Sequence, residues 1–167
     1  FHAWQIDQLA HAIPDFLMAA TLPSVEEAVG IAKAMEKTGI PYVISFVISR
    51  EGKVLDGTDL KTAFARIDGA TKHSPLGYMI NCAYPTFLCA EQQPGSVFDR
   101  LIGYQGNASS LDHCDLDNAE ELQSEKVEDW GEAMLNLNRS FGVKILGGCC
   151  GTGNEHLQYI IDKGLLK

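Results

Sequence analysis

Apolar residues occur along the chain in two kinds of pattern, and the two kinds alternate. Five runs are nearly continuous and contain many β-branched or aromatic residues, which is typical of strands buried on both faces of a sheet. These runs are Asp15–Ala20, Pro41–Ile48, Gly77–Cys82, Arg100–Tyr104 and Val143–Gly148. Between them, apolar residues recur at three- and four-residue spacing, as on one face of a helix. The alternation predicts an α/β fold of repeated βα units with a parallel sheet.

The clearest helix follows the first of these strands. Ser24 and Glu27 have the S-x-x-E spacing of a capping box, and the following apolar residues keep helical spacing as far as Met35. Gly39 then stands where a glycine commonly ends a helix. We therefore expect a helix between the first two strands, with the Ser24 and Glu27 side chains closing its N-terminus.

Two further helices flank the last strand. Before it, apolar residues recur at intervals of three and four, so that their stripe should cover the sheet. These residues are Val127, Trp130, Met134, Leu137 and Phe141. After it, Thr152 or Asn154 can cap a short final helix that ends near Gly164 and carries an apolar side. The residues of that side are Leu157, Ile160 and Ile161.

Composition and charge agree with a single folded domain over residues 1–167. Hydrophobic residues make up 46% of the chain and charged residues 21%, which is close to the average for globular domains. The longest apolar stretch, Tyr42–Ile48, is far shorter than the roughly 20 residues that cross a bilayer, so we expect no membrane partner. The net charge is -9, which argues against nucleic acid as a partner because nucleic-acid binding needs a basic surface.

The cysteines are the residues most informative about chemistry. There are five, and an odd number does not make a closed set of disulfides, so we expect a cytoplasmic protein whose thiols are free or bind a metal. Cys82, Cys149 and Cys150 follow the ends of two predicted strands, and the carboxyl ends of parallel strands meet at one rim. Glycines on both sides of the Cys149–Cys150 pair allow the backbone to leave strand geometry, so that both thiols can point the same way.

Three thiols at one rim would suit zinc. The ion binds thiolates tetrahedrally at about 2.3 Å, and catalytic sites keep one position open for a substrate. A substrate thiol in that position would be held as a thiolate, which is a nucleophile suited to alkyl transfer to sulfur. From the residues alone, two other interpretations stay open. The cysteines are buried apolar residues, or Cys149 and Cys150 form a redox pair that would leave Cys82 without a role.

The two remaining cysteines have no such placement. We interpret Cys89 and Cys114 as structural or incidental, because neither joins the strand ends at which the other thiols gather. His113 precedes Cys114 in a polar segment and is the basis of a rival metal site. A lone His-Cys pair is a weak metal signal, and we expect no site there.

Residues Gly147–Thr152, with the sequence GGCCGT, and the upstream Asn81-Cys82 pair resemble the zinc signature of the homocysteine S-methyltransferase family. Thr21-Leu22-Pro23 resembles the Thr-x-Pro that follows a strand in that family. The pairs Ser45-Phe46 and Asp56-Gly57 also fit its pattern. The resemblance therefore extends over nearly the whole chain.

The resemblance implies a (β/α)8 TIM barrel in which Cys82, Cys149 and Cys150 bind Zn2+. It implies two substrates: homocysteine, bound through its sulfur at the fourth position, and a methyl donor of the sulfonium, ammonium or folate class. The homocysteine thiolate would attack the methyl group, and methionine would form. Thr21 and Asn107 are the substrate-binding residues that the resemblance implies, the latter within a segment similar to the family's Pro-Asn-Ala-Gly.

Two differences from the family bear on this expectation. Where the family usually places a glutamate before Thr-x-Pro, this chain has Ala20, so no carboxylate stands there to pair with an ammonium group. A closed barrel needs around 250 residues and eight strands, whereas this chain of 167 residues has five predicted strands. We therefore expect the C-terminal five βα units of an incomplete barrel, whose open edges pair with another copy or with a separate N-terminal portion.

Three functions follow for testing. The first is a zinc-dependent homocysteine S-methyltransferase. The second is a non-catalytic zinc-binding relative or an inactive fragment, which Ala20 and the missing strands favour. The third is an unrelated α/β protein whose cysteines are core or redox residues. Homocysteine binding separates the first two, and absence of metal would favour the third.

Overall fold

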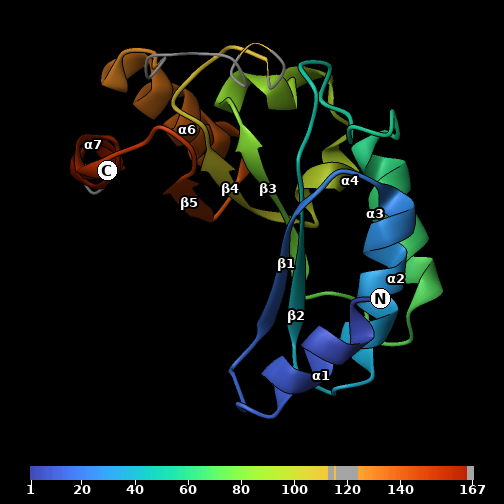
Figure 1. Cartoon of the computed structure of the whole chain (residues 1–167). Coiled ribbons are helices and arrows are strands. Elements are labelled where there is room, and N and C mark those ends of the chain that lie inside the picture. The colour runs from blue at the N-terminus through green and yellow to red at the C-terminus, as the bar shows by residue number, and fades with distance from the viewer. Residues whose placement is uncertain (113–114, 116–123, 165–167) are drawn as a thin grey trace.

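In the computed structural model of the chain, five parallel strands form a single sheet among the described residues, and helices alternate with them (Figure 1). The structure describes residues 1–112, 115 and 124–164. Every neighbouring pair of strands is parallel, and each of the predicted strands overlaps an observed one, so the predicted α/β fold is confirmed. The strands are β1 (Leu17–Leu22), β2 (Tyr42–Phe46), β3 (Gly77–Ala83), β4 (Leu101–Gly106) and β5 (Ile145–Gly148).

The described helices include the three expected from the sequence and others that the periodicity did not identify. The expected helices are α2 (Val25–Glu36), α6 (Val127–Phe141) and α7 (Asn154–Gly164). The additional ones are α1 (Ala3–Ala10), α3 (Leu60–Ala70), α4 (Gly95–Phe98) and the 3-10 helices η1 (Pro85–Leu88) and η2 (Ala90–Gln92). Within the part of the chain that the structure describes, every helix is too short or too polar to traverse a bilayer.

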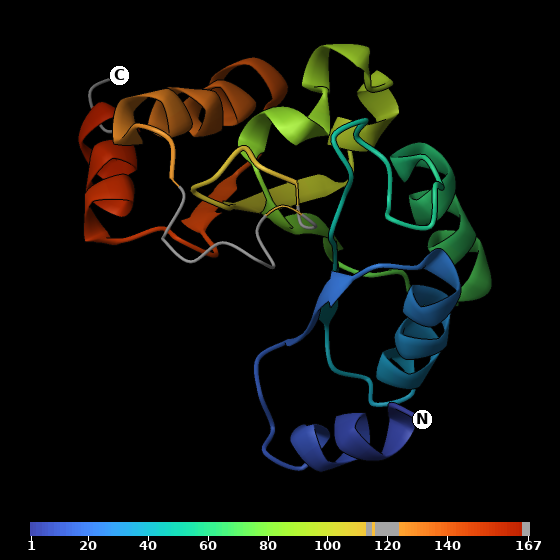
Figure 2. The same cartoon turned by 45° about the horizontal axis from the view of Figure 1, so that its top comes forward.

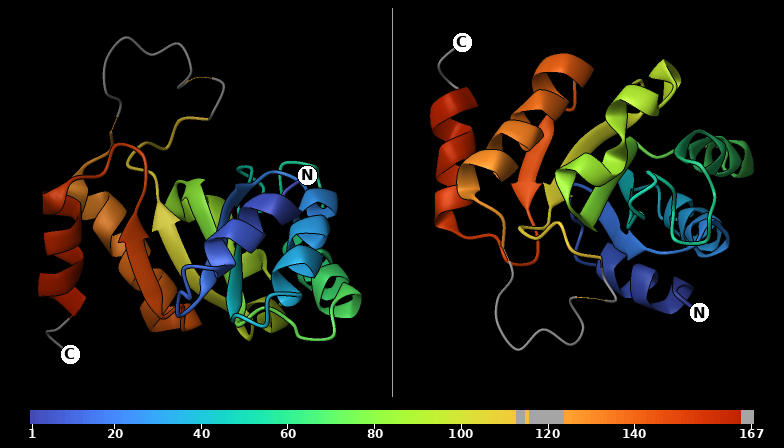
Figure 3. Two further views of the ribbon diagram at one scale, coloured as in Figure 1. Left: turned by 60° about the horizontal axis from the view of Figure 1, so that its bottom comes forward. Right: turned by 90° about the horizontal axis from the view of Figure 1, so that it is seen from above.

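The strands follow one another across the sheet in chain order, from β1 to β5. Crossovers between parallel strands are right-handed, so connections that all advance in one direction place their helices on one face. Seen from above in Figure 3, the helices lie along the outer side of a curved sheet. This is the arrangement of a TIM barrel, and the five described strands form part of one, with the sheet open between β1 and β5.

The two faces of the sheet are packed differently. On the helix-facing side, large residues such as Phe46, Tyr78 and Tyr104 belong to the main hydrophobic core. On the inner side the polar residues Ser45 and Asn81 are buried, 0% and 4% exposed respectively. Buried polar side chains need hydrogen-bond partners, and these two residues bond to each other.

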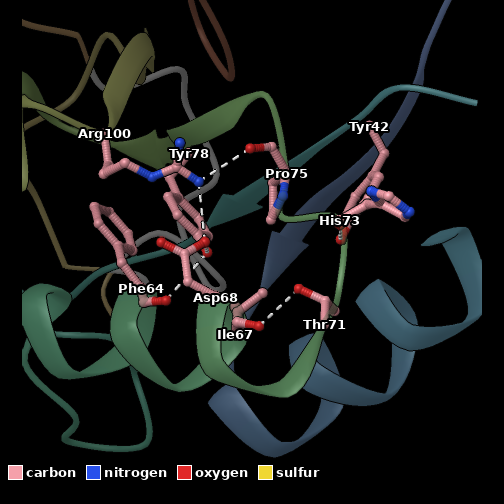
Figure 4. Close-up of polar contacts among 9 residues, drawn as sticks. All are labelled: Tyr42, Phe64, Ile67, Asp68, Thr71, His73, Pro75, Tyr78 and Arg100. Carbon is pink, nitrogen blue, oxygen red and sulfur yellow. Dashed lines mark hydrogen bonds and ion pairs between the residues drawn. The ribbon is translucent and has the colours of Figure 1, made fainter.

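The amino-terminal end of the sheet is joined to α3 by a hydrogen-bonded cluster (Figure 4). The Tyr78 hydroxyl donates to Asp68 Oδ1 at 2.8 Å, and Arg100 donates to the same oxygen at 2.9 Å. Arg100 also donates to the Pro75 carbonyl at 3.0 Å. The ring of Tyr78 stacks on Phe64 with centroids 4.0 Å apart. This cluster lies at the end of β3 opposite Cys82 and fixes α3 on the sheet.

The capping box predicted for α2 is wrong, although Ser24 is the N-cap residue. The Ser24 side chain makes no capping hydrogen bond. Instead, Asp56 from the segment after β2 accepts a hydrogen bond from the Val25 N–H at 2.7 Å. Glu27 lies 2.9 Å from His2 Nε2. A carboxylate from a distant segment therefore satisfies the helix terminus, where it also faces the positive end of the helix dipole.

The apolar stripe of α6 is confirmed, because Trp130, Met134 and Leu137 are all buried, and Gly142 ends the helix with φ of 74°. The apolar side predicted for α7 is largely wrong. Leu157 and Ile161 are 42% and 50% exposed. Among the described residues of α7, Ile160 is the hydrophobic residue packed against the core.

The predicted apolar side of α7 is exposed because α7 packs beside α6 through a different face (Figure 2). A Cβ atom added to Gly131 of α6 would lie 2.2 Å from the ring of Tyr159, which shows that this ring covers the glycine. His156 is 3% exposed and meets the Trp130 ring edge-on, with centroids 5.0 Å apart. The face of α7 that is buried is therefore the one bearing His156 and Tyr159.

Candidate metal centre

Cys82, Cys149 and Cys150 come together at the carboxyl end of the sheet. Cys82 lies near the end of β3, and the other two cysteines directly follow β5, which ends at Gly148. The Sγ atoms of Cys82 and Cys149 are 2.9 Å apart, those of Cys82 and Cys150 are 3.8 Å apart, and those of Cys149 and Cys150 are 4.0 Å apart. In the described part of the chain, this is the one group of His, Cys, Asp or Glu ligand atoms placed to share a metal ion.

The spacing of the three sulfurs suits a tetrahedral thiolate site. Sulfurs bound to zinc at about 2.3 Å with tetrahedral angles are about 3.8 Å apart. Two of the three observed distances, 3.8 Å and 4.0 Å, fit this value, and the third, 2.9 Å, is shorter. Since the described residues add no fourth side chain to the group, the donor set matches an open site with three protein ligands.

The protonation of the thiols depends on their contacts with one another. Burial, together with the neighbouring Cys149 thiol, raises the pKa of Cys82 to about 12. Burial also opposes ionisation of Cys149, but hydrogen bonds from the Cys82 thiol and from the N–H groups of Cys150 and Cys82 outweigh it and lower its pKa. One thiol of this pair ionises at the expense of the other. Both sulfurs become thiolates together only if a cation offsets their repulsion.

A β-bulge places the Cys82 side chain at the rim. Across β3 and β4, Asn81 pairs with Gln105 and Ala83 pairs with Gly106, so Cys82 is an extra residue in β3. Its φ is 54°, in the left-handed region that few residues other than glycine adopt. In a regular strand, Cys82 would point to the face opposite that of Asn81, toward the helices. The bulge therefore redirects the thiol, as bulges near functional sites commonly do.

A tight turn holds the other two cysteines. The Thr152 N–H and hydroxyl both donate to the Cys149 carbonyl, at 3.2 Å and 2.7 Å. A Cβ atom added to Gly148 would lie 2.1 Å from Thr152 Oγ1, so only glycine leaves room for this contact. Gly151 has φ of 78°. The backbone thus leaves strand geometry at the cysteine pair, as the glycines predicted.

Two other residues expected at the site lie on the same rim, at the ends of β1 and β4. Thr21 is exposed near the end of β1, with φ of 61°. Asn107 directly follows β4, and its N–H donates to the Ala83 carbonyl at 3.0 Å. The Asn107 side chain is 5% exposed, yet its Oδ1 has no hydrogen-bond partner among the residues that the structure describes. A buried acceptor of this kind is unfavourable unless a ligand or water supplies the donor.

The remaining expectations have different outcomes. Cys89 lies apart from the group, where its thiol donates to the Arg50 carbonyl at 3.2 Å, in line with a structural role. His113 and Cys114 lie outside the described residues, so the expectation for them stays a prediction. Ala20 is exposed beside Thr21 and brings no carboxylate to this position.

The polar contacts of Asn81 and Ser45 with their neighbours were not anticipated from the sequence, although both residues belong to the family-like motifs. Ser45 donates to Asn81 Oδ1 at 2.6 Å inside the sheet. The available signal was a polar residue within each of two otherwise apolar strands. Such a residue needs an internal partner when it is buried.

Comparison with known sequences agrees with this geometry. The sequence model of the family described as homocysteine S-methyltransferase matches residues 1–163, which is nearly the full length of the chain. Comparison with individual curated proteins gave no significant match. The matched region contains the parallel sheet, its bulged strand end and all three clustered cysteines. The chain therefore belongs to the homocysteine S-methyltransferase family.

Proposed function

We propose that the chain transfers a methyl group to the sulfur of homocysteine, with Cys82, Cys149 and Cys150 as ligands of Zn2+. The observation that carries the proposal is the convergence of these three Sγ atoms from two strand ends, in a chain that belongs to this family. Zinc bound by three thiolates supplies a fourth position at which a substrate thiol is held as a reactive thiolate at neutral pH.

The reaction is a substitution at carbon. A lone pair of the homocysteine thiolate forms the new bond between sulfur and the methyl carbon. The bond from the methyl group to the nitrogen or sulfur of the donor breaks, and its electron pair stays on the donor. The products are methionine and the demethylated donor, whose class is a sulfonium, an ammonium or a folate.

Two residues of the rim are proposed to contact the substrate. Asn107 Oδ1 is a buried acceptor without a partner in the described part of the chain, so it is suited to an N–H donor such as the ammonium group of an amino acid. Thr21 is exposed at the end of β1, on the same rim, where it can line the entrance to the site. Neither role requires Asn107 or Thr21 to ionise.

The sheet supports a proposal about assembly. Residues 1–167 are proposed to fold as one domain that corresponds to the last five βα units of a barrel. Met18 on β1 and Ile145 on β5 are 37% and 49% exposed, and each of these strands pairs on one side among the described residues. Such edges favour association with another copy or with an N-terminal portion of the barrel. A stable monomer in light scattering would contradict this association.

One observation favours a second function, a zinc-binding relative that does not catalyse the transfer. Ala20 occupies the position at which the family usually has a glutamate, and no carboxylate replaces it there. The ammonium group of homocysteine would then lack its charged partner. Homocysteine binding separates the two functions, because the catalytic one requires an exogenous thiolate at the metal.

The first experiment is metal analysis of protein purified without a chelator. We expect about one zinc per chain in the wild type and its loss in Cys150→Ser. Cys89→Ser is the matched control, because Cys89 is a free thiol outside the group, and it should keep the zinc. No zinc in the wild type, or equal zinc in both variants, would contradict the proposed ligand set. Homocysteine titration of the zinc-loaded protein then tests the substrate.

A further inference from the structure

Asn81 connects three neighbouring strands through its side chain. Its Oδ1 accepts hydrogen bonds from the Thr21 N–H at 2.9 Å and from the Ser45 hydroxyl at 2.6 Å. Its Nδ2 donates to Thr21 Oγ1 at 2.6 Å. Since Thr21 is on β1, Ser45 on β2 and Asn81 on β3, one amide group ties the carboxyl ends of these strands together.

Two backbone irregularities flank this amide group. In β1, Ala19 pairs with Ile44 and Leu22 pairs with Phe46, so β1 contains one extra residue within 20–21. Thr21 has φ of 61° and Cys82 has φ of 54°, and such conformations are uncommon for any residue with a side chain. A β-branched residue is especially disfavoured there, so the surrounding structure must hold it in place.

The contacts of Asn81 supply that support. Both polar groups of Thr21 that could hydrogen-bond here, its N–H and its hydroxyl, are bonded to the same side chain. Asn81 also directly precedes Cys82, so a fixed Asn81 side chain fixes the direction in which the chain enters the second bulge. The Cys82 bulge in turn places the Cys82 Sγ atom 2.9 Å from that of Cys149 and 3.8 Å from that of Cys150.

We propose that Asn81 is a positioning residue of the metal centre: it holds the two bulges and so aims the Cys82 thiol at the other two cysteines. This inference rests on the proposed function, because it assumes that the three thiols bind a metal. Asn81 is 4% exposed, and its oxygen already accepts two hydrogen bonds from the protein. It therefore acts through Thr21 and Cys82, without contact with the substrate.

The test is the variant Asn81→Ala, with two measurements on the purified chain. Competition with a chromophoric chelator gives the zinc affinity, which we expect to fall by about 10- to 100-fold, as when other groups that orient metal ligands are removed. Substitution with Co2+ gives a sulfur-to-metal charge-transfer band, which we expect to weaken because Cys82 no longer keeps its direction.

Tyr78→Phe is the matched control. It removes a partly buried hydrogen bond of the same strand, β3, but at the end opposite the cysteines. It should lower the stability of the fold and leave both the zinc affinity and the Co2+ spectrum unchanged. A general loss of stability therefore does not imitate the expected result.

The outcomes separate the two proposals. Wild-type protein that binds no zinc overturns the proposed function itself. Zinc-binding wild type with an Asn81→Ala variant of equal affinity and identical Co2+ spectrum overturns the positioning role alone. If Asn81→Ala does not fold, Thr21→Val removes one of the three hydrogen bonds with little change in shape. It should weaken zinc binding in the same direction, and unchanged affinity and spectrum would overturn the inference.

Discussion

Replacing Tyr78 by phenylalanine removes one hydroxyl group and leaves the aromatic packing of the core in place. The hydroxyl donates to the Asp68 carboxylate at 2.8 Å, and a hydrogen bond to a charged partner contributes about 1.5–3 kcal/mol. The Asp68 side chain is 31% exposed and keeps its ion pair with Arg100, so the lower end of that range applies. We expect the free energy of unfolding to fall by about 1.5 kcal/mol.

Tyr42→Phe provides the comparison. The Tyr42 hydroxyl donates to a neutral acceptor, the His73 carbonyl, at 2.7 Å, and Tyr42 lies on the adjacent strand at the same end of the sheet (Figure 4). Loss of this hydrogen bond should lower the free energy of unfolding by about 1 kcal/mol. Urea denaturation of both variants measures the difference, provided that their m values agree with that of the wild type. Equal losses, or a greater loss for Tyr42→Phe, would refute the reasoning that the charged acceptor sets the magnitude.

The stability of Tyr78→Phe should also differ from that of the wild type in its dependence on pH. Burial raises the pKa of Tyr78 in the folded protein, whereas in the unfolded chain a tyrosine ionises at about pH 10. The folded state therefore holds this proton longer, and its stability falls as the pH rises above about 10. Tyr78→Phe has one such group fewer, so its stability should fall less steeply in alkali. Parallel curves for wild type and variant would count against this assignment.

Three further predictions concern other parts of the molecule. Gly131→Ala would place a methyl group 2.2 Å from the Tyr159 ring, and overpacking of this kind should cost about 1–3 kcal/mol in urea denaturation. Asp59 accepts a hydrogen bond from the Thr62 N–H, which lowers the pKa of the Asp59 carboxyl. Asp59→Ala should therefore lower the free energy of unfolding by about 1 kcal/mol above about pH 4 and by less below it, as measured by thermal melts on either side of this pH. Treatment of zinc-loaded protein with a chelator should lower its melting temperature, and an unchanged temperature would argue against a metal that binds the folded state.

The apolar runs were sufficient to predict the sheet, because strands buried on both faces leave a continuous signal in the sequence. The strand ends were less accurate. The first strand was predicted to end at Ala20, but β1 continues through the irregular residue Thr21 to Leu22. No periodicity in the sequence marks a residue of this conformation. The predicted cap of α2 failed for a related reason. Asp56 reaches the helix from a segment far along the chain, and spacing rules describe local contacts.

The candidate site was predictable to the same extent. The rule that parallel strands end on one rim was enough to predict that Cys82 lies near Cys149 and Cys150. The adjacent glycines indicated the turn that holds Cys149 and Cys150. The bulge at Cys82 had no counterpart in the sequence, since bulges with left-handed backbone usually contain glycine. Two of the three hydrogen bonds of Asn81 are made with Thr21, whose left-handed backbone was equally hidden.

The contacts at the metal centre join residues that are far apart along the chain. Cys82 and Cys149 are 67 residues apart, and the hydrogen bonds between Asn81 and Thr21 span 60 residues. Closing such long loops costs entropy before many other contacts have formed, so we expect pairings of this range to arise late in folding. On this expectation the three thiols come together only after most of the sheet has assembled. The proposed metal capture would then report on completed folding and would not nucleate it, unlike a zinc finger, in which closely spaced ligands fold around the ion.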